Sequence, residues 1–243
     1  MFMEKSVFKC KIEPRHVDFS NRVSLSSMCD IVLHVAGEDA RSRGFGIDAL
    51  AGNNYGWVLS RMCIELDYLP EEYSEFTVYT WISDYNRLSS TRNFILVDGQ
   101  EREFGRLVSQ WCMIDYNTRM PVDMNTMAKA HEGNMVDAPA PCERPRRIGV
   151  VEGEPVMKHK VAYSDIDFNR HMNTMRYIDL VFDSMPIEIP EQLSALRLDL
   201  NFMKEARYGD CLSLMSQSQE NTYQFAFRNE QGEALCRMAL EIR

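Results

Sequence analysis

The sequence predicts an α+β fold built from two tandem copies of one unit, in which a central helix is wrapped by an antiparallel β-sheet. Three observations support this prediction. Each half of the chain runs in the order strand, helix and several further strands. An offset of 149 positions places Asp18 on Asp167 and Val32 on Val181, which indicates an internal duplication. The segment 132–153 between the halves is rich in proline and lacks apolar periodicity, as expected of a linker.

Length and composition are those of an ordinary folded protein. The chain has 243 residues, of which 45% are hydrophobic and 26% charged, so it has room for one large domain or two small ones. We expect an N-terminal unit at residues 1–131, the linker at residues 132–153 and a C-terminal unit at residues 154–243. The alternative is a pair of unrelated α+β domains.

The first half begins with a strand between Ser6 and Pro14, followed by a helix that buries one face. Spacings of three and four mark that face, which consists of Leu25, Met28, Cys29, Val32, Leu33 and Ala36. Runs rich in β-branched and aromatic residues then predict strands at Trp57–Tyr68, Phe76–Ser83, Ser89–Val97 and Phe104–Tyr116. The pair Asp98-Gly99 indicates a hairpin turn between the last two strands.

The second half repeats this plan. A strand is predicted at Val156–Ala162, a helix at Asn173–Asp183, and further strands at Ala195–Met203, Cys211–Ser218, Tyr223–Arg228 and Ala234–Ile242, with a turn at Asn229–Gly232. A hydrophobic helix needs cover on nearly all sides, which a sheet curved around it supplies. This arrangement is the hot dog fold, and two copies in one chain make a double hot dog.

The most polar stretch of the chain directly precedes the second helix. Asp165, Asp167, Asn169, His171 and Asn173 alternate at every second position, so an extended backbone would turn all five side chains to one side. The unpaired N–H groups at the start of the helix would lie beside them, which predicts a site that stabilises developing negative charge.

The equivalent stretch of the first half has different residues. The offset places Ser20 on Asn169, Arg22 on His171 and Ser24 on Asn173, so the first half lacks the histidine and both amides. Only the second half is therefore expected to be catalytic, which leaves the first half for binding and for shaping a cavity.

Several other classes of protein are disfavoured. The D-x-D-x-N pattern at residues 165–169 begins like a calcium loop, but Arg170 stands where the loop needs glycine and Arg176 where it needs glutamate. The seven scattered cysteines lack zinc or disulfide spacing, and no metal or cofactor is expected. A net charge of −9 argues against nucleic-acid binding. No stretch has the length and apolar character of a membrane span or secretory signal, so we expect no membrane insertion and a cytoplasmic location.

Two motifs resemble the acyl-[acyl carrier protein] thioesterases of plants and bacteria, and the resemblance covers almost the whole chain. The family motif D-x-N-x-H-x-N, followed by a helix with Y-I, is matched by Asp167, Asn169, His171, Asn173, Tyr177 and Ile178. The family pattern R/K-E-C and then G-x-D resembles Lys204-Glu205-Ala206 and Gly209-Asp210. Trp57, Arg61, Arg92 and Trp111 also fall where the family has similar residues. Ala206 replaces the cysteine of the pattern, which removes a Cys-His-Asn nucleophile.

The resemblance implies a thioester hydrolase whose catalytic residues are Asp167, Asn169, His171 and Glu205. The leaving thiolate has a conjugate acid with a pKa near 8.5, so the harder tasks are to activate water and to hold the oxyanion. Glu205 or His171 could take a proton from water, and Asn169 could hold the water or the histidine. Asp167 could orient these groups or attack the carbonyl itself, and the sequence leaves both roles open. Backbone N–H groups around His171 to Asn173 could meet the oxyanion.

The resemblance also places an apolar acyl cavity mainly in the first half, beside its helix. Its candidate substrate-binding residues are Met28, Cys29, Val32 and Leu33, together with Asn173, which is also a good helix cap. The implied partner is an acidic acyl carrier protein with a phosphopantetheine arm, for which Arg41 with Arg43, or Arg144 with Arg146 and Arg147, could form a basic patch. The protein could be a monomer or a homodimer.

Three other functions remain open at this point. The first is the same hydrolysis acting on acyl- or aryl-coenzyme A, and the second is a hot dog protein that only binds acyl groups. The third is a dehydratase, because that chemistry uses a histidine and a carboxylate on the same fold.

Overall fold

The strands of this computed structural model pair into one continuous antiparallel sheet. The structure describes residues 4–52, 54–127 and 134–243. Within them the sheet has ten strands in the order β1-β3-β4-β5-β2-β7-β10-β9-β8-β6. The strands of the first half are β1 (Ser6–Lys11), β2 (Tyr55–Leu66), β3 (Glu75–Tyr85), β4 (Ser90–Asp98) and β5 (Glu103–Asp115). Those of the second half are β6 (Pro155–Lys160), β7 (Leu196–Phe202), β8 (Cys211–Gln219), β9 (Thr222–Arg228) and β10 (Ala234–Ile242).

The two halves have the same topology. From the outer edge inward, the first half reads β1-β3-β4-β5-β2 and the second reads β6-β8-β9-β10-β7, each being the same sequence of first, third, fourth, fifth and second strands. The halves meet where β2 pairs with β7 in antiparallel register, with Ile64 opposite Leu198. The predicted double hot dog is therefore confirmed.

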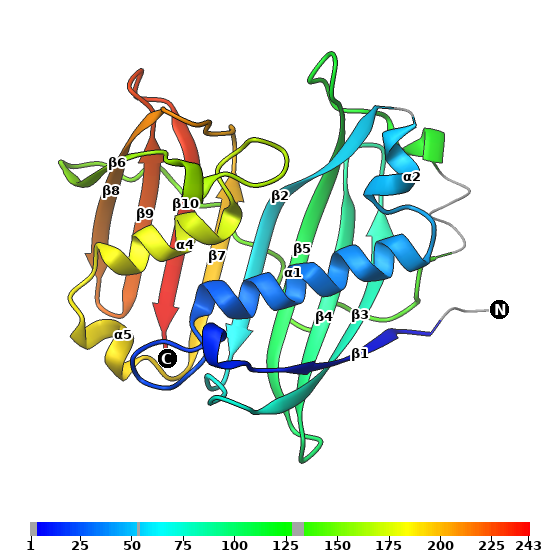
Figure 1. Cartoon of the computed structure of the whole chain (residues 1–243), viewed down its shortest axis with the longest axis horizontal. Coiled ribbons are helices and arrows are strands. Elements are labelled where there is room, and N and C mark those ends of the chain that lie inside the picture. Colours follow the sequence, from blue (N-terminus) through cyan, green and yellow to red (C-terminus); the bar gives the residue numbers. More distant parts are fainter. Residues whose placement is uncertain (1–3, 53, 128–133) are drawn as a thin grey trace.

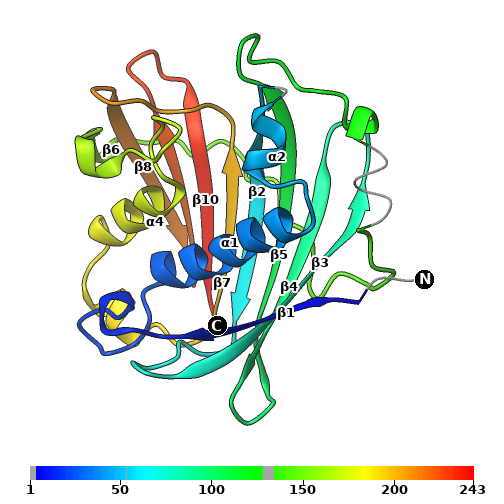
Figure 2. The ribbon, with the colours of Figure 1, turned by 45° about the vertical axis from the view of Figure 1, so that its right-hand side comes forward.

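Two helices lie against one face of this sheet, and the sheet curves around them (Figures 1 and 2). They are α1 (Leu25–Ser42) and α4 (Thr174–Asp183). Each begins at a side-chain cap, because Ser24 accepts a hydrogen bond from the Ser27 N–H at 3.2 Å and Asn173 accepts one from the Met175 N–H at 2.9 Å. Such caps satisfy N–H groups that have no partner inside the helix.

The alternation of residues in β7 separates the core from the outer face of the sheet. Leu196, Leu198 and Leu200 are buried in the core beneath the helices, whereas Arg197, Asp199 and Asn201 alternate with them and point to the other face. On that outer face Asp199 accepts the Arg146 N–H at 2.8 Å and Asn201 accepts the Ile148 N–H at 3.0 Å. The described part of the linker therefore crosses the outer face and is hydrogen-bonded to it.

The predicted strands agree with the structure to within a few residues at their ends. The short helices α2 (Ile47–Ala51) and α5 (Glu188–Gln192) were not predicted, nor were three 3-10 turns at Pro14–His16, Met124–Met127 and Tyr163–Asp165. The predicted boundary between residues 131 and 132 lies outside the described residues. In the part of the chain that is described, no helix has the length and apolar composition needed to cross a membrane.

Candidate active site

The polar stretch before α4 is a tight turn, so the prediction of an extended segment is wrong. The Asp167 N–H donates to the His171 carbonyl at 2.9 Å, and Ile166 pairs with Met172 across the turn. Arg170 has a φ of 64°, the left-handed conformation that such a turn requires. The chain reverses here, and Asp165 turns away to His159 and Arg176, whereas Asp167, Asn169, His171 and Asn173 line one cavity.

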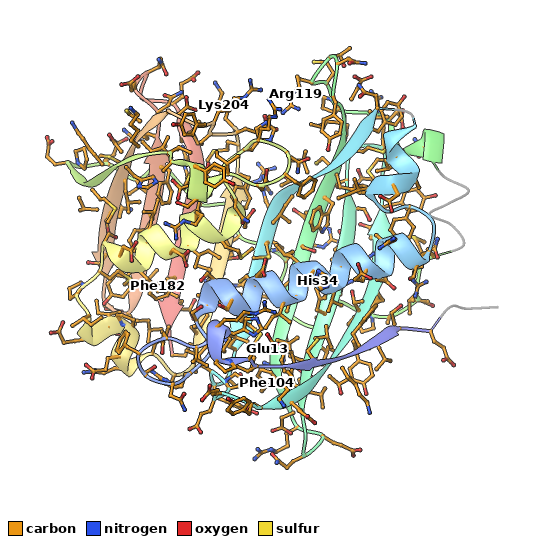
Figure 3. All side chains as sticks on the ribbon, viewed as in Figure 1. Glu13, His34, Phe104, Arg119, Phe182 and Lys204 are labelled. Atoms are coloured by element: carbon orange, nitrogen blue, oxygen red, sulfur yellow. The ribbon has the colours of Figure 1, made fainter. Side chains whose placement is uncertain are left out.

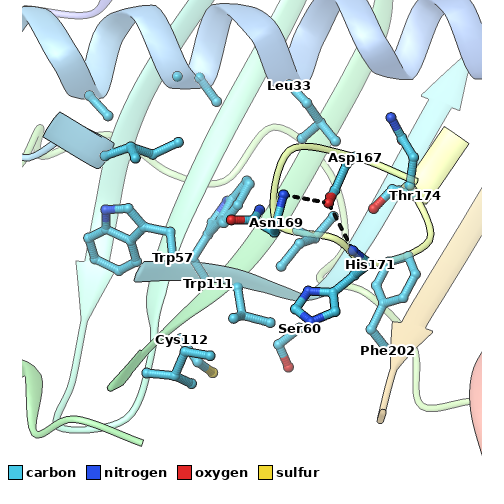
Figure 4. Close-up of a pocket in the computed structure, with 18 of the residues that line it drawn as sticks. Leu33, Trp57, Ser60, Trp111, Cys112, Asp167, Asn169, His171, Thr174 and Phe202 are labelled. Carbon is cyan, nitrogen blue, oxygen red and sulfur yellow. Dashed lines mark hydrogen bonds between the residues drawn. The ribbon is translucent and has the colours of Figure 1, made fainter. Parts of the chain in front are cut away.

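Asp167 organises the turn from inside. Its Oδ1 accepts the N–H groups of Asn169 at 2.8 Å and of His171 at 3.2 Å, both drawn in Figure 4. A carboxylate that accepts two backbone donors holds the residues on either side in a fixed orientation. Asp167 therefore sets the direction in which Asn169 and His171 leave the turn.

Glu205 reaches this turn from the loop that follows β7. The backbones are joined there, because the Met172 N–H donates to the Ala206 carbonyl at 2.8 Å and His171 pairs with Arg207. The side chains then meet, with His171 Nε2 at 3.0 Å from Glu205 Oε2. The two residues that sequence reasoning combined from separate motifs are thus in direct contact.

The environment of His171 favours its neutral form. Burial lowers the pKa of the imidazole below its usual value, and the positive charges of Arg119 and Arg207 act in the same direction. The carboxylates of Glu205 and Asp167 oppose this shift but do not overcome it. A neutral imidazole at neutral pH is able to accept a proton.

Two residues of the first half also reach the site, and sequence reasoning missed both. Arg119 pairs with Glu205 through the same Oε2 that contacts His171. The Tyr116 hydroxyl donates to Asn169 Oδ1 at 3.3 Å. Figure 3 shows Arg119 of the first half and Lys204, the neighbour of Glu205, close together at the same end of the molecule. No motif in the sequence marks Tyr116 or Arg119, because their partners lie far along the chain.

The predicted oxyanion donors are not available. The N–H groups of His171, Met172 and Asn173 donate to Asp167 Oδ1, to the Ala206 carbonyl and to the Asp165 carbonyl respectively. The expectation that these three groups meet a substrate carbonyl is therefore wrong. Thr174 is the next residue, and it lines the same cavity.

Asn173 lies at the cavity, whereas Asp165 does not. Asn173 lines the cavity while its Oδ1 caps α4, so its amide NH2 group is left for other partners. Asp165 is 1% exposed and turns away to His159 at 2.7 Å and Arg176 at 2.9 Å. Burial alone would raise the pKa of Asp165, but hydrogen bonds from the Ala162 N–H, His159 and Arg176 hold it below its usual value. This aspartate supports the fold and is not part of the site.

A cavity of about 1040 Å³ opens at these residues and extends along α1. Its lining includes Asp167, Asn169, His171 and Glu205 of the second half. From the first half it takes mostly apolar side chains, among them Leu33, Ala36, Phe45, Trp57, Leu59, Ile82, Trp111 and Ile114. Figure 4 shows Trp57, Trp111 and Leu33 around the space beside the turn.

Of the four helix residues predicted to bind an acyl chain, only Leu33 lines this cavity. Met28, Cys29 and Val32 are fully buried in the hydrophobic core. Their apolar periodicity identifies the face of α1 that packs on the sheet, whereas the cavity runs along an adjacent face of the same helix.

Of the other residues noted in the sequence, some line the cavity and some pack in the core. Trp57, Arg92 and Trp111 line the cavity, and Arg92 is held by the buried carboxylate of Asp39. Ala206 is 1% exposed and packs in the hydrophobic core.

Neither predicted basic cluster forms a patch of free charges at the cavity. Arg41 lies at its edge and pairs with Asp48 at 3.4 Å, while Arg43 pairs with Asp39. Arg146 belongs to the linker and pairs with Glu241. In the described residues, no three His, Cys, Asp or Glu side chains converge in a metal-binding arrangement.

The chain matches two family models that together span most of its length. Residues 5–129 match the acyl-ACP thioesterase N-terminal domain, and residues 151–242 match the acyl-ACP thioesterase C-terminal domain. Among curated proteins, an oleoyl-acyl carrier protein thioesterase of Coriandrum sativum is 22% identical over 238 residues. That alignment covers 88% of this chain and 62% of the plant protein, so the chain spans less than two thirds of that relative.

Solved structures agree over the full length. An acyl-ACP thioesterase from Bacteroides thetaiotaomicron is 35% identical with a TM-score of 0.89, and the match covers 98% of each chain. A 12:0-ACP thioesterase from Umbellularia californica has the same fold, with 17% identity, a TM-score of 0.85, and coverage of 98% of this chain and 97% of that one. With the two family models and the double hot dog architecture, these matches show that the chain belongs to the acyl-ACP thioesterase family.

Proposed function

We propose that the protein hydrolyses the thioester of acyl-[acyl carrier protein] and releases free fatty acid, thereby terminating fatty acid synthesis. The observation that carries this proposal is the contact between His171 Nε2 and Glu205 Oε2 at 3.0 Å, at the mouth of a cavity with a mostly apolar lining. Such a cavity suits an acyl chain, and the paired imidazole and carboxylate suit the activation of water.

In this proposal His171 is the general base. A carboxylate can only accept a hydrogen bond, so Nε2 carries the proton in its contact with Glu205 and Nδ1 is left to accept one. Water attacks the thioester carbonyl as its proton passes to His171, and the tetrahedral intermediate then collapses with expulsion of the thiolate. His171 returns the proton to the thiolate, while Glu205 orients the ring and stabilises its charged form.

We propose the amide groups of Asn169 and Asn173, with the N–H of Thr174, as donors to the oxyanion. All three residues line the cavity next to His171. The side-chain oxygens of both asparagines already accept hydrogen bonds inside the protein, from the Tyr116 hydroxyl and from the Met175 N–H. Their NH2 groups are therefore the ends left to face a substrate.

We assign Asp167 the orienting role. Its Oδ1 is engaged by two backbone N–H groups, which is the arrangement of a residue that shapes the turn. The attacking role would instead require this carboxylate to move onto the substrate carbonyl and form a transient anhydride.

We also propose a division of labour between the halves. The N-terminal unit, residues 1–131, would bind the acyl chain and the C-terminal unit, residues 154–243, would supply the chemistry, with residues 132–153 as the linker. The support is the composition of the cavity wall, whose apolar residues come mainly from the first half and whose candidate catalytic residues come from the second. The cytoplasmic location and the monomeric or homodimeric state remain predictions from the sequence.

The decisive experiment compares carrier-protein and coenzyme A thioesters of the same fatty acids. We expect hydrolysis of both, with a higher kcat/KM for the carrier-protein thioester, and a product profile that identifies the preferred chain length. A higher kcat/KM for the coenzyme A thioester would support the assignment as a thioester hydrolase but would identify acyl-coenzyme A as its substrate. Binding without hydrolysis would indicate an acyl-binding protein, and an enoyl product from a 3-hydroxyacyl thioester would indicate a dehydratase.

A further inference from the structure

The turn that follows β5, residues 115–120, belongs to the first half but extends to the candidate catalytic residues of the second. Tyr116 contacts Asn169, and Arg119 contacts Glu205. We propose that Tyr116 and Arg119 are positioning residues, which fix Asn169 and Glu205 from across the boundary between the halves. This inference rests on the proposed function, because it assigns roles relative to the same site.

The turn is rigid enough to hold two partners in place. Asp115 Oδ1 accepts the N–H groups of Asn117 at 2.7 Å and of Thr118 at 3.0 Å. The Arg119 N–H donates to the Asp115 carbonyl at 2.8 Å, and the Asp115 N–H donates to the Met120 carbonyl at 3.0 Å. These hydrogen bonds hold the backbone of the turn in one conformation. The positions from which the Tyr116 and Arg119 side chains extend are therefore fixed.

The backbone at Arg119 is strained for the residue it carries. Its φ is 60°, a conformation that costs a non-glycine residue on the order of 1 kcal/mol and that glycine or asparagine adopts more readily. This conformation is uncommon for a bulky cationic residue, and here it accompanies a side chain that reaches Glu205 in the second half. Its guanidinium pairs with the carboxylate oxygen that also contacts His171, so Arg119, Glu205 and His171 form one connected chain of groups.

A glycine in β2 shows that the place of Tyr116 is also built into the fold. Gly56 is buried in the strand, where glycine weakens a sheet, and its φ is not positive. A Cβ atom added at Gly56 would lie 2.0 Å from the Tyr116 hydroxyl oxygen and 2.2 Å from Cζ. The absence of a side chain at this position therefore makes room for the phenol that reaches Asn169.

The contacts have distinct consequences for the chemistry. By donating to Asn169 Oδ1, the Tyr116 hydroxyl leaves the amide NH2 group as the free end. Arg119 prevents the Glu205 carboxylate from rotating away from His171, and its charge disfavours the imidazolium form. His171 also faces Asp167 and Arg207, whose opposite charges remain when Arg119 is replaced.

The test uses the full chain with the substitutions Tyr116→Phe, Arg119→Gln and Arg119→Lys. The matched controls are Tyr68→Phe and Arg102→Gln, because Tyr68 and Arg102 bind Asp98 in the turn between β4 and β5, at the other end of β5. Kinetics with an acyl thioester give kcat and KM separately. Nuclear magnetic resonance of the His171 ring gives its pKa without requiring turnover.

We expect kcat to fall about three- to tenfold for Tyr116→Phe, which removes one hydrogen bond. For Arg119→Gln we expect a fall of roughly ten- to hundredfold, since the carboxylate loses its fixed position, and a partial recovery in Arg119→Lys. KM should change little in these variants. The pKa of His171 should rise in Arg119→Gln, which moves the acidic limb of the pH–rate profile to higher pH, while both controls match the wild type.

Two results would overturn the inference. One is a wild-type kcat in Arg119→Gln and Tyr116→Phe, and the other is a lowered melting temperature in Arg119→Gln with no change in the pKa of His171. Failure of the proposed function is a separate result, because wild-type protein would then hydrolyse no thioester. The pKa of His171 in Arg119→Gln would still decide the inference in that case.

Discussion

The turns before the two central helices have the same backbone and different side chains. In the first half the Asp18 N–H donates to the Arg22 carbonyl at 2.9 Å, and in the second the Asp167 N–H donates to the His171 carbonyl at 2.9 Å. Asn21 has a φ of 58° and its counterpart Arg170 has 64°. Both turns lead into a helix that begins at a side-chain cap.

The difference lies in what the equivalent side chains contact. Arg22 stands where the second half has His171, and its guanidinium donates to the backbone carbonyls of Pro190 at 3.3 Å and Glu191 at 2.8 Å, in α5 of the second half. His171 instead contacts Glu205 at the cavity. The same turn conformation thus has two uses. In the first half its side chain binds the second half, and in the second half its side chain presents an imidazole to the cavity.

The largest expected effect separates these two roles. His171→Ala should lower kcat at least roughly a hundredfold, because it removes the proton acceptor, and should leave the melting temperature nearly unchanged. Arg22→Ala should leave kcat unchanged but destabilise the fold by about 1–3 kcal/mol, because several carbonyls lose their donor. Thioester kinetics and urea unfolding of both variants provide the measurements. If Arg22→Ala lowered kcat as much as His171→Ala, the contrast between the turns would be wrong.

A smaller effect distinguishes the two roles of Asp167. Asp167→Asn keeps a carbonyl oxygen that can accept the N–H groups of Asn169 and His171, so an orienting residue should lose less than about tenfold in kcat. Asp167→Ala removes that acceptor and should lose more. Steady-state kinetics of the pair decide the question, since a nucleophile would be abolished equally by both changes. In the first half, Asp18→Asn and Asp18→Ala are the matched controls and should leave kcat unaltered.

The smallest effect concerns the residue at the left-handed position. Arg170→Asn copies Asn21 of the first half and relieves the preference against φ near 60°, so we expect it to stabilise the protein by roughly 0.5 kcal/mol. Chemical denaturation measures the change. Kinetic constants should be those of the wild type, and a large loss of activity would show that the Arg170 side chain has a role in the site.

The fold could be predicted from the sequence because its signals are local. Alternating and helical periodicities identified both central helices and each strand of the described residues, and the repeat of element order identified the duplication. The short helices α2 and α5 span five residues each, too few for a periodic signal. The same periodicity misled at Met28, Cys29 and Val32, because apolar residues that fill a core and those that line a cavity have the same spacing.

The site was only partly predictable. Asp167, Asn169 and His171 share one motif, and Glu205 was supplied by a second motif on a later loop. The alternation of polar residues predicted an extended strand, because the left-handed φ of Arg170, which reverses the chain, leaves no mark in the pattern of residue types. Tyr116 and Arg119 could not be identified from the sequence, because their roles depend on contacts between the two halves, which form only in the folded chain.

Because β2 pairs with β7, the two halves are joined by backbone pairing between strands as well as by side-chain packing. A half expressed by itself would expose the paired part of its inner strand, residues 61–66 of β2 or 196–201 of β7, as an open edge able to pair with a second copy or to aggregate. Conversely, we expect the two halves to stay associated after a single proteolytic cleavage of the linker, because β2 and β7 remain paired. Studies of isolated halves should therefore begin by asking what has taken the place of the missing strand.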